Sequence, residues 1–184
     1  MARQIVVVGS SNTDMILQVK HIPRPGETLL GQNFTMAAGG KGANQAVAAA
    51  RAGGQVSFIV RVGQDVFGQL AVKGFEQENI ALDFVVLDPE YPSGTALIFV
   101  AEDVENSIGV ASGANSQLSS ADVEAASERI GAADVVLMQL ETPLETVATA
   151  TRIAAEQEAR VILNPAPAQP LTPGFSECLD SHPQ

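Results

Sequence analysis

The sequence has few of the side chains that build most metal and nucleophilic sites. Its 184 residues hold one cysteine, Cys178, and two histidines, His21 and His182. A single cysteine cannot form an internal disulfide, which is typical of a protein in a reducing cytoplasm. With so few histidines, a serine–histidine–aspartate triad or a histidine–cysteine metal site is excluded as a working hypothesis. We therefore predict a cytoplasmic protein and assign no metal ligands in this chain.

Long apolar runs and positive charge are also scarce. No apolar stretch approaches the roughly 20 residues that a membrane-spanning helix requires, so we expect no membrane partner. The chain has 21 acidic and 10 basic residues, and its formal net charge of -11 repels nucleic acid. Residues 1–64 nevertheless hold six basic and only two acidic side chains. An anionic or polyhydroxyl ligand is therefore most favoured in this N-terminal third.

Short β-branched runs alternate with helical stretches along most of the chain. The runs are typical of strands buried on both faces. Thr142, Pro143 and Glu145 predict a capping box at a helix start, with Thr142 as N-cap. The expected strands are 5–8, 55–62, 134–140 and 160–163, and the expected helices are 42–52, 65–78, 120–130 and one that follows Thr142. This order predicts an α/β fold in which helices flank a parallel, right-handed sheet.

Two segments interrupt this alternation. Residues 15–38 and 84–110 contain apolar stretches on either side of polar or proline-rich turns, the pattern of antiparallel hairpins. Such hairpins at the strand ends of an α/β sheet can form a lid over a ligand, although ordinary surface hairpins fit the pattern equally well. Beyond them, we expect one domain over residues 1–170 and an unstructured tail over 171–184.

Polar residues follow the first expected strand, which ends at Gly9. If the chain stays extended, Asn12 and Asp14 project to one side and Thr13 to the other. An amide beside a carboxylate suits a vicinal diol, which offers two donors and two acceptors. Asparagine and aspartate after a strand are also common turn residues, so this segment alone favours a turn.

A glycine-rich loop, Ala38-Gly39-Gly40-Lys41-Gly42-Ala43-Asn44, opens an alanine-rich helix. Glycines let the backbone approach a ligand closely, the helix start offers free N–H groups, and Lys41 adds a positive charge. These features favour hydroxyl or phosphate oxygens over the alternative of a loose connector. The ordinary P-loop is excluded, because Gly40-Lys41 is followed by Gly42 rather than by serine or threonine.

Glu141 comes directly after the expected strand 134–140. Ligands of open α/β sheets lie off the carboxyl ends of the strands, and Asn12, Asp14, Glu141 and Asn164 all follow such ends. An acid that interacts with the positive start of a helix explains Glu141 equally well.

These motifs resemble the ribokinase-like, or PfkB, family of carbohydrate kinases. The matching segments are 9–14, 25–28, 39–49, 63–65, 96–100, 113–115, 139–141 and 164–168. The resemblance implies a Rossmann-like α/β core with a small β-sheet lid, which closes over a sugar and joins two copies of the chain in a homodimer. By the family pattern, the residues that bind the sugar would be Asn12, Thr13, Asp14, Gly40, Lys41, Gly42, Ala43, Asn44 and Glu141.

The resemblance also implies a reaction. ATP would donate its γ-phosphoryl group to the 5-hydroxyl of D-ribose, with Mg2+ and a monovalent cation (K+) as activators, while the closed lid excludes water. Two family signatures are absent: the G-A-G-D segment with the catalytic aspartate, and the N-x-x-E segment associated with Mg2+. We therefore expect only the N-terminal portion of the fold, with its C-terminal part missing, no catalytic residue in this chain and negligible phosphoryl transfer.

Two other functions stay open. The chain could be a non-catalytic sugar-binding or dimerising module, which ribose calorimetry and sedimentation would test. It could also belong to a kinase for another substrate, such as deoxyribose, fructose or a nucleoside. Competition among sugars separates these, because pocket hydrogen-bond donors strongly reject an analogue that lacks a hydroxyl.

Overall fold

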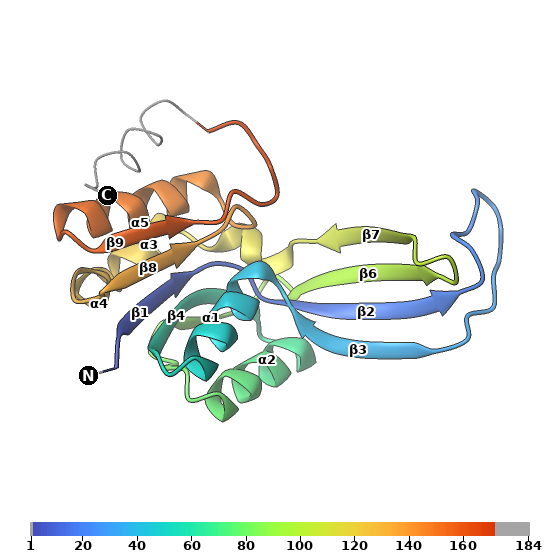
Figure 1. Ribbon diagram of the computed structural model, residues 1–184, viewed down its shortest axis with the longest axis horizontal. Helices are drawn as coiled ribbons and strands as arrows, with labels where there is room; N and C mark the ends of the chain where they lie inside the picture. Colours follow the sequence, from blue (N-terminus) through green and yellow to red (C-terminus); the bar gives the residue numbers. More distant parts are fainter. Residues whose placement is uncertain (1, 172–184) are drawn as a thin grey trace.

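The structure, a computed structural model, describes residues 2–171, which form two β-sheets (Figure 1). The larger sheet has five parallel strands in the order β5-β4-β1-β8-β9. These strands are β1 (Gln4–Val8), β4 (Gln55–Gly63), β5 (Val85–Asp88), β8 (Val135–Met138) and β9 (Arg160–Leu163). The helices around them are α1 (Lys41–Arg51), α2 (Val66–Gln77), α3 (Ser120–Glu124), α4 (Ser127–Gly131) and α5 (Leu144–Glu156). The predicted α/β fold is confirmed.

The core lies on both faces of this sheet. Successive side chains of β1 point to opposite faces. Val6 and Val8 pack in the cluster that includes α3, α4 and α5, whereas Val7 packs in the cluster that includes α1 and α2. In the second cluster, the rings of Phe58 and Phe75 meet edge to face at 5.1 Å between centroids. The continuous apolar run of β1 is therefore explained by burial on both sides.

The smaller sheet projects away from this core (Figure 1). Its strands are β2 (Asn12–Val19), β3 (Phe34–Gly39), β6 (Gly94–Ala101) and β7 (Asn106–Ala111), in the order β3-β2-β6-β7. The β2–β3 and β6–β7 pairs are antiparallel, which confirms the two predicted hairpins, and β2 joins them by pairing parallel with β6.

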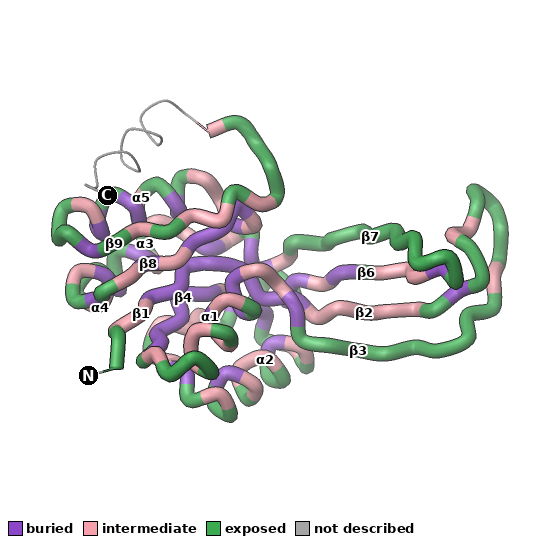
Figure 2. The backbone as a smooth tube through the Cα atoms, in the orientation of Figure 1, coloured by how far each residue is buried: buried purple, intermediate pink, exposed green. Residues whose placement is uncertain are grey.

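Large apolar side chains are exposed on both faces of the smaller sheet. The backbone tube in Figure 2 is coloured as exposed along the edge strands β3 and β7. The register Asp14–Ala96–Val110 places Val110 on the same face as Asp14, and Ile108 two residues earlier shares that face. The opposite face carries Phe34, Met36 and Leu97. Such patches are unusual on a monomer and indicate a contact surface.

The bounds of both predicted lid segments differ from those of the smaller sheet. The segment predicted over 84–110 begins too early, because β5 pairs in parallel with β4 and completes the edge of the core sheet. The second excursion starts only at Gly94. The first one is longer than predicted, because β2 begins at Asn12 and β3 ends at Gly39.

Two predicted helix features were also wrong. The helix expected over 120–130 is broken into α3 and α4. The capping box occurs at Ser119 and Asp122 rather than at Thr142. Pro143 has a ψ of 135°, so it stays outside the helix as the N-cap, and α5 begins only at Leu144. Thr142 is buried, and its Oγ1 has no hydrogen-bond partner among the described residues.

The end of the described chain returns to the core. Leu171 packs against the cluster on the α5 face. The rest of the segment predicted as a tail, 172–184, lies outside the described residues. Among residues 2–171, none of the helices combines the length and the apolar character needed to cross a bilayer.

Candidate functional site

The turn after β1 carries the first predicted site residues into the smaller sheet. Asn12 and Asp14 occupy alternate positions of β2, so they share one face of the strand. The Asp14 carboxylate lies over Gly39 of β3, where a Cβ atom would be 2.3 Å from both carboxylate oxygens. Glycine at position 39 therefore makes room for this carboxylate.

Gly40 turns the chain from β3 into α1. Its φ of 91° lies in the left-handed region that favours glycine. A Cβ atom there would also lie 2.8 Å from the Asn12 backbone nitrogen and from the Ser11 Cα. Because this approach is so close, the start of α1 rests against the turn after β1, and the Ala43 amide donates to the Ser10 carbonyl at 2.8 Å.

Glu141 caps α1 from a distant part of the chain, since no neighbouring side chain caps this helix. Its Oε2 accepts hydrogen bonds from the Lys41 amide at 2.9 Å and from the Ser10 hydroxyl at 2.5 Å. Its Oε1 pairs with Lys41 Nζ at 2.6 Å. The Ser10 hydroxyl also accepts from the Gly42 amide at 3.3 Å. Glu141 thus interacts with a helix start, but with that of α1 rather than α5.

The two carboxyl groups of the site are shifted in opposite directions. Burial, and then the negative charge of Glu141, raise the pKa of Asp14 above its ordinary value of 3.8, against a smaller lowering by Lys41. Burial also acts to raise the pKa of Glu141, but hydrogen bonds from Lys41 and Ser10 outweigh it and hold this pKa below 4.5. Glu141 is therefore a stabilised carboxylate, whereas folding disfavours the charge of Asp14.

Asp14 and Lys41 keep hydrogen-bonding capacity for a ligand. Within residues 2–171, no hydrogen bond reaches the Asp14 carboxylate. The Lys41 ammonium has three protons, and one of them is directed to Glu141. Its side chain remains 39% exposed. A free acceptor and a partly free cationic donor therefore lie close together at the base of the smaller sheet, which suits neighbouring hydroxyl groups.

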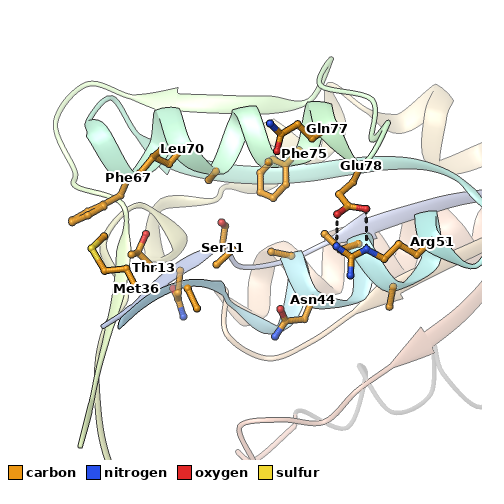
Figure 3. A pocket seen from close by; sticks show the side chains of 18 residues that line it. Ser11, Thr13, Met36, Asn44, Arg51, Phe67, Leu70, Phe75, Gln77 and Glu78 are labelled. Atoms are coloured by element: carbon orange, nitrogen blue, oxygen red, sulfur yellow. Dashed lines mark hydrogen bonds and ion pairs between the residues drawn. The ribbon is translucent and has the colours of Figure 1, made fainter. Parts of the chain in front are cut away.

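A groove of about 670 Å³ lies between α1, α2 and the smaller sheet (Figure 3). Most of its lining is apolar, and at one end Arg51 Nε donates to Glu78 at 2.9 Å. The groove divides the predicted site residues into two groups. Asn12, Thr13, Ala43 and Asn44 line it, whereas Asp14, Gly40, Lys41, Gly42 and Glu141 are outside its lining.

Sequence reasoning missed two polar residues of this region. Ser10 links Glu141 to the start of α1, and Asn115 is 2% exposed beside Asn12. Asn115 lies in a short 3-10 segment, Gly113–Gln117. The only sequence signal for it was its place in the matching segment 113–115, which carries no information about its partner.

The described residues do not supply a conventional metal centre. Residues 2–171 contain no group of three or more histidine, cysteine, aspartate or glutamate side chains arranged to hold an ion. The described part of the chain therefore offers no carboxylate cluster to which Mg2+ can be assigned.

Comparison with known proteins identifies the family of this chain. The family model described as pfkB family carbohydrate kinase matches residues 2–184. The ribokinase of Haemophilus influenzae is 46% identical over 180 residues, covering 98% of this chain and 59% of that protein. The deoxyribokinase of Salmonella typhimurium is 40% identical over 164 residues, covering 89% of this chain and 54% of that protein.

A solved structure gives the same result. The ribokinase of Arabidopsis thaliana, complexed with ribose and ATP, superimposes with a TM-score of 0.77 at 32% identity. The match covers 89% of this chain and 53% of that one. The chain thus spans between half and three-fifths of the length of these relatives. By the family model and these likenesses, the chain belongs to the pfkB family of carbohydrate kinases.

Proposed function

We propose that this chain carries the sugar-binding site of a ribokinase. The complete enzyme transfers the γ-phosphoryl group of ATP to O5 of D-ribose and gives D-ribose 5-phosphate. The observation that carries the proposal is the open Asp14 carboxylate beside the Lys41–Glu141 pair, in a chain 46% identical to a ribokinase. The solved relative that contains ribose and ATP supports the same substrate pair.

Each side chain has a distinct task in this site. Asp14 accepts hydrogen bonds from sugar hydroxyls, and Lys41 donates to their oxygens with the protons that Glu141 leaves free. Glu141 holds Lys41 and the start of α1 in place. Asn12, Thr13 and Asn44 extend the polar surface toward the groove. The smaller sheet, which carries Asn12 and Asp14 at its base, acts as the lid that excludes water.

The same sheet supports a homodimer. Its exposed apolar side chains on both faces, including Ile108, Val110 and Leu97, give a second copy of the chain a surface to cover. Contact between two lids would bury these side chains near both sugar sites. The dimer therefore accounts for apolar exposure that the single chain leaves unexplained.

The nucleotide half of the reaction depends on other groups. ATP, Mg2+ and K+ belong to the proposed activity, but the described residues offer no carboxylate cluster for Mg2+, so we derive no step through it. The sequence also lacks the G-A-G-D segment. We therefore expect this chain to bind ribose in the cytoplasm without phosphorylating it at a measurable rate, because phosphoryl transfer rests on positioning and charge stabilisation.

Two measurements on the purified chain test the proposal. Calorimetry with D-ribose should show saturable binding, and Asp14→Asn should weaken it, whereas Asp83→Asn, a remote control, should not. An assay of ATP-dependent ribose 5-phosphate formation should show no product. Turnover would overturn the inactivity, and absence of ribose binding by the unaltered chain would overturn the site.

A second substrate is favoured by one observation, the 40% identity to a deoxyribokinase. Titration with 2-deoxyribose in competition with ribose distinguishes the two, because a site that hydrogen-bonds the 2-hydroxyl rejects the sugar that lacks it. Stronger binding of 2-deoxyribose would reassign the substrate and leave the position of the site unchanged.

A further inference from the structure

Asn115 is a buried asparagine whose side-chain hydrogen bonds, within residues 2–171, all go to Ser11 and Asn12, where the sugar site begins. Its Oδ1 accepts from the Ser11 amide at 2.8 Å. Its Nδ2 donates to the Ser11 carbonyl at 3.1 Å and to Asn12 Oδ1 at 2.8 Å. Both protons of this amide group are therefore used, and 103 residues of sequence separate the two asparagines.

The Ser11 backbone determines which end of the Asn115 amide is which. A backbone N–H can only donate, so the Asn115 atom that faces it must be the oxygen, and the atom that faces the Ser11 carbonyl must be the nitrogen. The nitrogen then faces Asn12, and the Asn12 atom opposite it must be an acceptor. The orientation of the Asn12 amide is thus fixed by a chain of contacts that begins at the backbone.

Gly94, the first residue of β6, makes room for this contact. A Cβ atom there would lie 2.2 Å from both Asn115 Nδ2 and Asn12 Oδ1. The opposite end of the amide, Asn12 Nδ2, donates no hydrogen bond within residues 2–171. Solvent can reach this nitrogen, because it is not one of the buried polar side-chain atoms of that range that lack a hydrogen-bond partner. Asn12 therefore offers a donor from the strand face that carries the Asp14 acceptor.

We propose that Asn115 is a positioning residue for sugar recognition, because it makes Asn12 present its NH2 group, rather than its carbonyl oxygen, to one hydroxyl oxygen of the sugar. The inference rests on the proposed sugar site and adds the direction of one hydrogen bond in it. Asn115 does not touch the sugar. It acts by excluding the flipped Asn12 amide, whose oxygen would compete with Asp14 for hydroxyl protons.

The test uses D-ribose and its 1-deoxy, 2-deoxy and 3-deoxy analogues with the 184-residue chain. One of the three analogues lacks the hydroxyl that faces Asn12. The unaltered chain should bind this analogue about 10-fold to 100-fold more weakly than ribose, because the Asn12 NH2 group then has no acceptor. Asn115→Asp supplies an acceptor where Asn12 Oδ1 now finds a donor, so the Asn12 amide should flip. Discrimination against that analogue should then fall by about 10-fold, because Asn12 no longer donates to the hydroxyl oxygen, while discrimination against the others remains. Ser116→Ala, in the same segment, should keep the original pattern.

A second variant serves if Asn115→Asp does not fold. Asn12→Asp retains an oxygen for Asn115 Nδ2 but has no NH2 group, so its discrimination against the same analogue should fall as well. An unchanged pattern in either variant would overturn the proposal, as would equal weakening of all four sugars, which indicates a structural role only. If the unaltered chain binds none of them, the sugar site itself is wrong and the positioning role falls with it.

Discussion

The Glu141 carboxylate accepts the Lys41 backbone amide at 2.9 Å and pairs with the Lys41 ammonium at 2.6 Å. Glu141, in the segment that follows β8, therefore both caps α1 and binds the side chain of its first residue, Lys41. The two residues are 100 positions apart, so this contact forms only when the segment after β8 packs against the glycine-rich loop. The stability of the loop and its capacity to bind a sugar thus depend on the same contact.

Glu141→Gln should lower the free energy of unfolding by about 1–3 kcal/mol, because a partly buried charged partner of Lys41 and Ser10 is lost. The pKa of Glu141 is lowered by folding, so its contribution is present above pH 4.5 and is lost as the pH falls through the folded value. Urea unfolding at several pH values should show the difference between variant and wild type shrinking below pH 4.5. The exposed Glu124→Gln serves as control, and an equal loss there would contradict the capping role.

Asp14→Asn should stabilise the fold and weaken ribose binding. Folding raises the pKa of Asp14, so stability falls as the pH rises from 3.8 through the folded pKa, and the charged form is penalised at neutral pH. The variant carries no such charge. Its melting temperature should exceed that of wild type at pH 7, and the difference should vanish below pH 3.8. If the variant melts at a lower temperature than wild type at pH 7, the predicted penalty on the Asp14 charge is wrong.

Gly39→Ala should weaken ribose binding about 10-fold or more while the chain still folds. The new methyl group would occupy the place of the Asp14 carboxylate, and a flexible side chain can move away at little cost in stability. Gly74→Ala is the matched control, since a Cβ atom there meets nothing within 4 Å. In the middle of α2 it should stabilise the chain by about 0.5–1 kcal/mol and leave binding unchanged. Calorimetry and thermal unfolding measure both, and equal ribose affinity in the two variants would refute the proposed cause.

Ile108→Lys should convert the proposed dimer into a monomer. Ile108 is 55% exposed on the Asp14 face of the smaller sheet, and a charge there opposes burial against a second lid. Sedimentation velocity at several concentrations measures the outcome. Val104→Lys is the control, because it adds the same charge at the turn between β6 and β7. The proposed dimer contact is wrong if the wild-type chain is monomeric at all concentrations or if both variants dimerise.

The sequence predicts the core well because its strands are identifiable from local patterns. The run Ile5-Val6-Val7-Val8 indicates burial on both faces, and each face does carry a cluster. Capping was harder to predict, because Ser119 and Thr142 both precede an acid by three residues. Only Ser119 forms the box, since Pro143 keeps an extended ψ and leaves Thr142 packed in the interior. Local chemistry proposes such a cap, and tertiary packing decides it.

The candidate site was partly within reach of the sequence. Asp14 and Glu141 could be identified from the rule that ligands lie off the carboxyl ends of parallel strands. Lys41 was indicated by the glycine-rich start of a helix. The partner of Glu141 did not follow, because α1 and α5 are equally plausible helix starts in sequence. The role of Asn115 could not be predicted either, because its partners, Ser11 and Asn12, lie more than 100 residues away in the sequence.

β1 continues directly into β2 through the turn at Ser10 and Ser11, so a rigid rotation of the smaller sheet about this fulcrum would act over the whole length of β2. β2 has 8 residues, so its far end lies about 26 Å from that fulcrum. A rotation of about 10° there displaces the tip by roughly 4–5 Å over that arm, while Asp14, near the fulcrum, moves by only a small fraction of this distance. A shift of roughly 1 Å at Asp14 would thus correspond to a displacement about four times larger at the tip, where a probe attached near residue 104 would register occupancy of the site.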